Sequence, residues 1–193
     1  MNKRKAGEDF YFLHKIIPLG DFIDITGTCV IPSPRASDRV PFGTGMAIGK
    51  YLHSKEEIFY TYSPDCFLAL RPFLQSVGRL YKAQPVYITS FFQQLQESLQ
   101  HYLADIHAVD ALKEINANCS SETSFINRFY RWFDAFRIIK FLHYASREYF
   151  KQIPVPEAAV DFLEITGYGK KPDPLNSLDL LMILRELERG IKR

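Results

Sequence analysis

Aromatic side chains constrain the fold of this chain more than any other feature of its sequence. Sixteen phenylalanines, eleven tyrosines and one tryptophan make up 15% of its 193 residues. Each such ring removes about 150–250 Å² from water when it is buried. We therefore expect most of the rings to form a large hydrophobic core, and the remainder to line a pocket or a partner surface.

The charge balance and the composition exclude two broad classes of protein. Lysine and arginine total 24 against 22 for aspartate and glutamate, so the formal net charge is only +2. A chain that is 47% hydrophobic and so weakly charged is neither intrinsically disordered nor a polybasic nucleic-acid protein. We therefore expect a folded globular protein.

The cysteine pattern limits the redox and metal chemistry that the chain can have. The three cysteines are widely spaced, at Cys29, Cys66 and Cys119. Their number is odd and they form no CxxC pair, so they indicate neither a disulfide framework nor a zinc site. We expect free thiols in a reducing compartment, with no metal and no cofactor. The basic run near the start is not followed by an apolar segment, so we expect no signal peptide, no membrane association and a cytoplasmic location.

The order of the segments predicts a mainly α fold of the α+β class, in a single domain over residues 1–193. Residues 1–62 read as a mixed segment of strands and loops. Within it, β-branched and aromatic residues broken by proline and glycine predict two strands over 10–31 and a third over 56–62. Residues 63–193 predict a helical body of about five helices.

Capping residues and prolines mark the predicted helix boundaries. Ser63, followed by a proline, is typical of a helix start, and Pro85 marks the next boundary. Apolar residues at helical spacing predict one helix over 87–106 and a longer one over 121–150. Gly167 is expected to end a short helix near the end of this body.

One face of the helix predicted over 121–150 combines aromatic rings with a histidine and an arginine. At about 100° per residue, this face holds Phe125, Phe129, Trp132, Phe136, Ile139, His143, Arg147 and Phe150. In the functional interpretation, Trp132, His143 and Arg147 line a pocket for an anionic or planar ligand. In the structural interpretation, the helix is buried in the core, with a hydrogen-bonded histidine and an arginine ion pair. Its other charges, Arg128 and Arg131 among them, need partners or must reach water.

The loop over 32–45 is rich in proline, glycine and serine, and it is long for a connection inside a domain. Guanidinium groups bind anions, and glycine lets the backbone approach a ligand closely. The residues of this loop that suit an anionic ligand are Arg35, Arg39, Gly43, Thr44 and Gly45. The loop does not match the P-loop pattern, and the competing interpretation is a rigid structural loop whose arginines form ion pairs.

Two further patterns favour simple explanations. Glu97, His101 and Asp105 recur at helical spacing, as metal ligands do, but a solvated helix face explains them without a metal. Cations alternate with aromatic residues over 121–150, which is typical of nucleic-acid binding only where the rings are exposed. Since a core position suits these rings better, the sequence disfavours a nucleic-acid partner.

These observations predict a non-enzymatic binding or protein-interaction module, which binds a small anionic ligand or a protein partner. The sequence identifies no catalytic residues, because it lacks the GxSxG and HExxH patterns. The alternative is an enzyme or ligand-binding domain for a phosphate- or carboxylate-bearing small molecule, in which the 32–45 loop closes over the 121–150 helix. A homo-oligomer is compatible with either function.

Overall fold

The computed structural model describes most of the chain: residues 8–17, 44–53, 59–167 and 177–190, with scattered positions between 20 and 36. The chain divides into two compact units, one formed by residues 1–59 together with 172–193 and the other by residues 60–171. The boundary at residue 60 lies close to the change of character predicted at residue 63, and the single domain stays a prediction.

The described residues confirm a mainly helical fold with a small strand element. The sheet has two antiparallel strands, β1 (Tyr60–Thr61) and β2 (Ile153–Pro154), in which Tyr60 pairs with Pro154. The strand predicted over 56–62 is therefore present in part. Within the described ranges, no helix combines the length and the apolar character that a membrane span requires.

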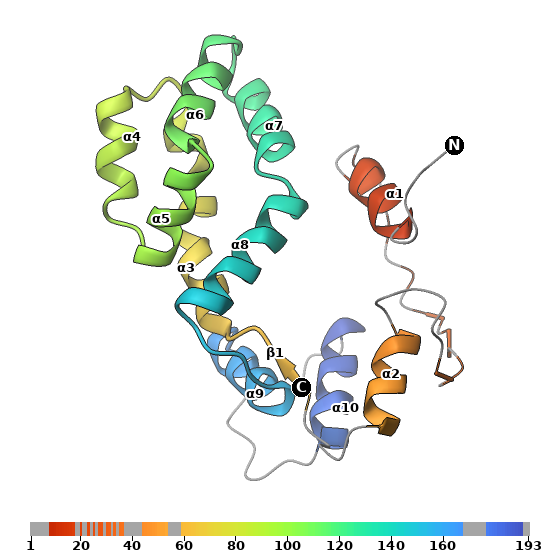
Figure 1. The fold of residues 1–193 in the computed structure, drawn as a ribbon. Helices are drawn as coiled ribbons and strands as arrows, with labels where there is room; N and C mark the ends of the chain where they lie inside the picture. Colours follow the sequence, from red (N-terminus) through yellow and green to blue (C-terminus); the bar gives the residue numbers. More distant parts are fainter. Residues whose placement is uncertain are drawn as a thin grey trace. The chain divides into compact units, whose positions relative to one another are not determined.

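The first unit contains helices α1 (Glu8–Ile16), α2 (Thr44–His53) and α10 (Ser177–Glu188), shown in Figure 1. Helix α1 corrects the prediction of strands over 10–31. The rings of Phe10 and His14 stack with their centroids 5.9 Å apart, a contact between residues i and i+4 that a helix provides and a strand does not. The described positions of the second predicted strand also have no strand pairing.

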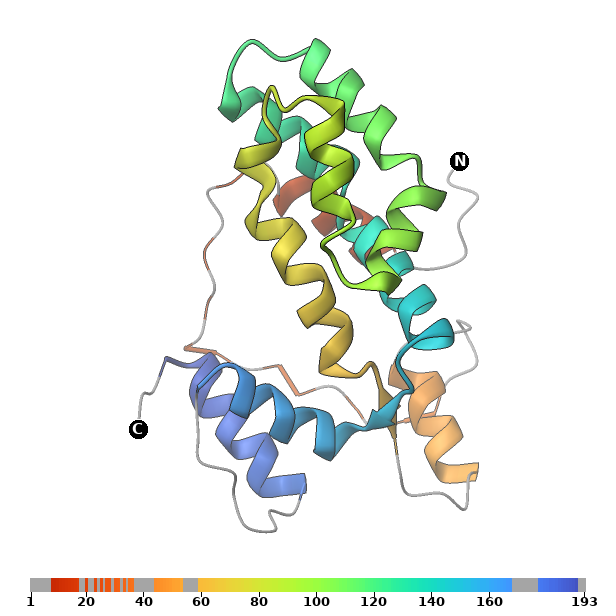
Figure 2. The same ribbon diagram turned by 90° about the vertical axis from the view of Figure 1, so that its left-hand side faces the viewer.

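The second unit holds the main hydrophobic core. Its helices, in chain order, are α3 (Pro64–Gln75), the 3-10 helix η2 (Val77–Leu80), α4 (Pro85–Phe92), α5 (Glu97–Asp105), α6 (Ala108–Ala117), α7 (Glu122–Trp132), α8 (Ala135–Glu148) and α9 (Val155–Ile165). Figure 1 shows α4, α5 and α6 side by side, and α6 contacts both of the others as well as α7. Figure 2 shows α9 leading away from the small sheet, which it contacts.

Phe73 lies at the centre of the aromatic core that the composition predicts. Its ring centroid lies 5.8 Å from that of Phe92, 5.5 Å from that of Phe129 and 5.1 Å from that of Phe133. All four side chains are buried. The core therefore joins residues from α3, α4 and α7 with the residue that follows α7.

Several predicted helix ends are confirmed by their local geometry. The Ser63 hydroxyl oxygen accepts a hydrogen bond from the backbone N–H of Asp65 at 3.2 Å, which caps α3. Pro85 is the first residue of α4. Gly167 adopts a positive φ of 71° just after α9, a conformation that glycine accepts without steric cost.

The single helix predicted over 121–150 is wrong, because α7 ends at Trp132 and α8 begins at Ala135. Phe133 leaves the helical region, with ψ at 67°, and buries its ring against Phe73. Asp134 then starts the new helix, since its carboxylate accepts a hydrogen bond from the Arg137 backbone N–H at 2.9 Å. The break also changes the buried face, so Phe136 is exposed while Phe141 is fully buried.

The single helix predicted over 87–106 is also wrong, because α4 and α5 are separate. Leu95, in the connection, is buried in the core. Gln96 caps α5 by accepting a hydrogen bond from the Ser98 backbone N–H at 2.7 Å. Glutamine is not among the usual helix-capping residues, so the sequence offers no start signal at this point.

Candidate functional site

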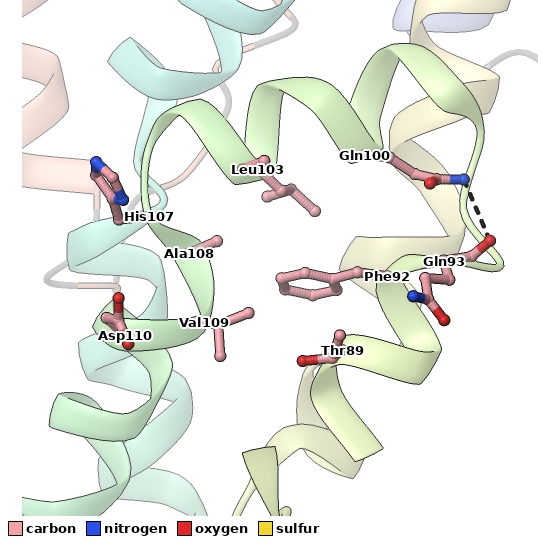
Figure 3. Close-up of a pocket in the computed structure, with 10 residues that line it drawn as sticks. Thr89, Phe92, Gln93, Gln100, Leu103, His107, Ala108, Val109 and Asp110 are labelled. Carbon is pink, nitrogen blue, oxygen red and sulfur yellow. Dashed lines mark hydrogen bonds between the residues drawn. The ribbon is translucent and has the colours of Figure 1, made fainter. Parts of the chain in front are cut away.

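An open groove lies between α4, α5 and α6, with a volume of about 300 Å³. Its lining residues are Thr89, Phe92, Gln93, Gln100, Leu103, Ala104, His107, Ala108, Val109 and Asp110. Phe92, Leu103 and Ala108 are buried and form an apolar floor. Figure 3 shows His107 and Asp110 at one end of the groove and the two glutamines at the other.

The turn between α5 and α6 sets the geometry of this groove. His107 joins the two helices with φ at 51° and ψ at 45°, the left-handed conformation that histidine adopts more readily than most residues. This residue lets the chain change direction within a few positions, and α5 and α6 contact each other beside the turn. Helix α4 contacts α6 and completes the third wall.

Two of the three neutral polar side chains that line the groove, Gln100 and Thr89, form hydrogen bonds to the backbone. The Gln100 amide donates hydrogen bonds to the backbone carbonyls of Gln93 at 3.2 Å and Leu95 at 2.7 Å. The Thr89 hydroxyl donates to the Pro85 carbonyl at 3.0 Å. These side chains therefore fix the walls and do not offer a reactive hydroxyl.

The two titratable residues of the groove, His107 and Asp110, are both exposed at its rim. Asp110 accepts a hydrogen bond from the Lys113 ammonium group, with 3.2 Å between Nζ and Oδ1. Because this pair is solvent-exposed, it contributes little to stability. The rim is thus polar over an apolar floor, which is the usual construction of a binding site.

A second groove, of about 290 Å³, lies between α6 and α7. Its lining residues are Glu114, Ile115, Asn118, Arg128, Arg131 and Trp132. Trp132 is half-buried, and the Arg137 guanidinium carbon lies 5.3 Å from the centroid of its ring. Of the site residues predicted from the sequence, Trp132 is the one that lines a groove described here.

The other predicted residues of the 121–150 segment lie elsewhere on α8. His143 is exposed, and its ring centroid lies 5.8 Å from that of Tyr62. Arg147 is exposed and pairs with the neighbouring Glu148, with 2.5 Å between Nε and Oε1. Neither residue lines either of the two grooves.

The predicted loop residues belong to the first unit. Arg35 is exposed, and its backbone N–H donates to the Ser33 carbonyl at 2.9 Å. Thr44 and Gly45 are the first residues of α2, whereas Arg39 and Gly43 lie outside the described residues. The shared site of this loop and the 121–150 segment stays a prediction, because the loop belongs to the first unit and the segment to the second.

The His101 ring faces a pair of tyrosines at the end of α8, Tyr144 on the helix and Tyr149 just after it. His101 Nδ1 and the Tyr149 hydroxyl form a hydrogen bond, and the ring centroids of Tyr149 and Tyr144 lie 5.9 Å apart. Burial, followed by the hydrogen bond to Tyr149, raises the pKa of Tyr144 to about 12. Among the residues that the structure describes, no three histidine, cysteine or acidic side chains are grouped to hold a metal ion.

The comparisons with known proteins returned no relatives. No family model matches the chain, and neither a curated protein nor a solved structure matches it. Sequence reasoning also missed the groove between α4, α5 and α6, because its floor forms only where the single helix predicted over 87–106 divides into α4 and α5, with α6 following as a third helix. The available signal was the position of His107 and Asp110 just beyond the Glu97–Asp105 pattern.

Proposed function

We propose that the second unit is a non-enzymatic binding module, and that the groove between α4, α5 and α6 receives an apolar side chain of a partner protein. One observation carries this proposal: an open cavity of about 300 Å³ has a buried apolar floor and a polar rim. An apolar side chain on the floor leaves water, which is favourable by about 25 cal/mol per Å². The rim is placed to bind polar backbone groups of the same partner.

The hydrogen bonding of the groove supports binding in preference to catalysis. Thr89, the hydroxyl-bearing residue of its lining, donates to a backbone carbonyl of its own helix. The Gln100 amide is likewise occupied by two carbonyls. Nucleophilic catalysis requires a hydroxyl or thiol that is free to attack and has a base beside it, and the described lining has no such pair.

The experiment is to select binders from a displayed library of random peptides with the full chain, and to retest them on two tryptophan variants. Ala104 is exposed and lines the groove, so Ala104→Trp fills its mouth. Ala117 is also an exposed helical alanine, but it lines neither groove, so Ala117→Trp is the matched control. Circular dichroism verifies that both variants are folded.

The proposal predicts that Ala104→Trp weakens the selected peptides by at least about tenfold, a change of roughly 1.4 kcal/mol in binding free energy. Ala117→Trp is expected to leave their affinity unchanged. Peptides that bind the Ala104→Trp chain as tightly as the original chain would overturn the proposal. The alternative predicted from the sequence is an enzyme in which the 32–45 loop closes over the 121–150 helix. No contact among the described residues supports it.

A further inference from the structure

We propose that the groove between α6 and α7 is a separate binding site for a phosphate monoester on a peptide side chain. This groove has a volume of about 290 Å³ and shares no lining residue with the groove between α4, α5 and α6. Two arginines and one tryptophan line it, together with a single carboxylate. The inference is independent of the proposed function because it rests on different residues.

Arg128 and Arg131 supply the positive charge of this site. They stand three residues apart on α7, a spacing that places two side chains on one face of a helix. Both side chains are exposed. Neither guanidinium group forms a hydrogen bond or an ion pair with any part of the chain that the structure describes. Like charges at this spacing repel each other, and a bound dianion would remove that repulsion.

The helix dipole explains only part of this arrangement. Arg131 lies in the last turn of α7, where the dipole favours a cation. Arg128 stands one turn earlier, where this effect has faded, yet it lines the same groove. A shared anionic ligand accounts for both positions, because two guanidinium groups can each donate paired hydrogen bonds to the oxygens of one phosphate.

The apolar part of the lining indicates which kind of side chain the phosphate is attached to. Trp132 and Ile115 are half-buried and present apolar surface beside the arginines. The Arg137 guanidinium carbon lies 5.3 Å from the centroid of the Trp132 ring. Such a wall suits the hydrocarbon or aromatic part of a phosphorylated side chain, and tyrosine offers the largest such surface.

Glu114 narrows the choice of ligand to a single, localised anion. Its side chain lines the groove from α6 without forming an ion pair to either arginine. One turn earlier on α6, Asp110 is exposed as well. A continuous polyanion such as RNA would bring further phosphates against these carboxylates, whereas one phosphorylated side chain would not. The charge pattern therefore favours a phosphopeptide over a nucleic acid.

The test uses the fluorescence of Trp132, which is the only tryptophan of the chain, in the full chain. The probes are an alanine-rich peptide with one phosphotyrosine, its unphosphorylated twin, free phosphotyrosine, inorganic phosphate and single-stranded RNA. The variants are Arg128→Gln, Arg131→Gln and Glu114→Gln. Arg71→Gln is the matched control, because Arg71 is an exposed helical arginine that lines neither groove.

The expected result is saturable binding of the phosphopeptide, with weaker binding of free phosphotyrosine. Each groove-arginine variant should lose about tenfold or more in affinity, the usual loss for one charge-assisted hydrogen bond. Arg71→Gln should bind normally, and Glu114→Gln should bind more tightly because it removes a repelling charge. Since the second phosphate pKa is about 6, affinity should fall as the pH drops below this value.

Three outcomes would overturn this proposal. The first is equal binding of the phosphorylated and unphosphorylated peptides. The second is phosphopeptide binding that survives both arginine substitutions in folded variants. The third is binding of RNA or inorganic phosphate as tightly as the phosphopeptide. None of them bears on the groove between α4, α5 and α6, whose test uses Ala104→Trp.

Discussion

Arg137 holds the end of one helix against the start of the next, through its contact with Trp132. Its guanidinium group donates a hydrogen bond to the Trp132 carbonyl and lies over the Trp132 ring, 5.3 Å from the centroid. The buried Tyr102 hydroxyl donates to the Arg137 carbonyl at 2.9 Å. These contacts provide hydrogen-bond partners for the Trp132 and Arg137 carbonyls at the junction. Particular side chains therefore stabilise the break between α7 and α8.

The carboxylate of Asp134 stabilises this break by capping α8. Replacing Asp134 with alanine removes the acceptor for the Arg137 N–H and should lower the free energy of unfolding by about 0.5–2 kcal/mol. Asp134→Asn should lose much less, because asparagine is also a good helix-capping residue. Urea denaturation of the three proteins measures the difference. Equal losses for the two variants would contradict the capping role.

Asn116 ties α6 to the turn that follows η2. Its amide donates to the Leu80 carbonyl at 3.0 Å, and its amide oxygen accepts from the Lys82 N–H at 2.6 Å. Lys82 has a positive φ of 52°, so this hydrogen bond also supports a costly backbone conformation. Asn116→Ala should therefore destabilise the fold by about 1–3 kcal/mol, because the Lys82 N–H loses its partner and the Leu80 carbonyl keeps only the hydrogen bond from the Ala83 N–H at 3.3 Å.

Asn118 provides the control for that prediction. Its side chain donates to the Glu114 carbonyl, one turn earlier in the same helix, so it joins no distant segments. Asn118→Ala should change the free energy of unfolding by no more than about 0.5 kcal/mol. If thermal or urea unfolding showed similar losses for both asparagines, the proposed role of Asn116 would be wrong.

Phe73 should dominate the stability of the second unit, because it contacts three other buried rings. Phe73→Ala is expected to cost about 3–5 kcal/mol. Phe67→Ala, at a half-exposed position on the same helix, should cost about 1 kcal/mol or less. Chemical denaturation compares the two. A larger loss at Phe67 than at Phe73 would place the core elsewhere.

The buried thiol of Cys66 should make the fold less stable in alkaline solution. Burial, and then the Asp65 carboxylate, raise the pKa of Cys66 from 9.0 to about 11. Between these values the folded chain keeps a proton that the unfolded chain has lost, so the free energy of unfolding falls as the pH rises. At lower pH the thiol is protonated in both states and contributes no slope.

Cys66→Ala tests this linkage, because alanine has no proton to lose. Urea denaturation at pH values between 9.0 and about 11 should show a smaller decline for the variant than for the original chain. The raised pKa values of Tyr62, Tyr102 and Tyr144 add a decline above 10.0. Because Cys66 contributes to the rise at Tyr62, the two proteins are compared below that pH. Identical slopes below that pH would contradict the assignment to Cys66.

The sequence predicted the parts of this fold that local chemistry determines. Ser63, Pro85 and Gly167 act through their own backbone and nearest neighbours, so their helix ends were visible in the sequence. The breaks at Phe133 and Leu95 were not, because both residues leave the helix to bury an apolar side chain in the core. Burial of this kind depends on tertiary contacts, and helical periodicity alone continues through it.

The same reasoning explains how far the site could be predicted. Trp132 was selected for its ring, and it does line a groove. His143 and Arg147 were placed beside it by assuming one straight helix, and the break after Trp132 changes the face on which they lie. Predicting the groove beside His107 would have required knowing that α4 packs on α6. The spacing of residues in the sequence gives no information about that contact.

Amide chemical-shift mapping of the full chain with peptides selected from the random library tests the central claim most directly. Binding in the groove between α4, α5 and α6 predicts shifts concentrated at Thr89, Gln100, Ala104 and Val109, which line it, and their loss in Ala104→Trp. Shifts confined to residues outside this groove, or unchanged in the Ala104→Trp variant, would contradict the account.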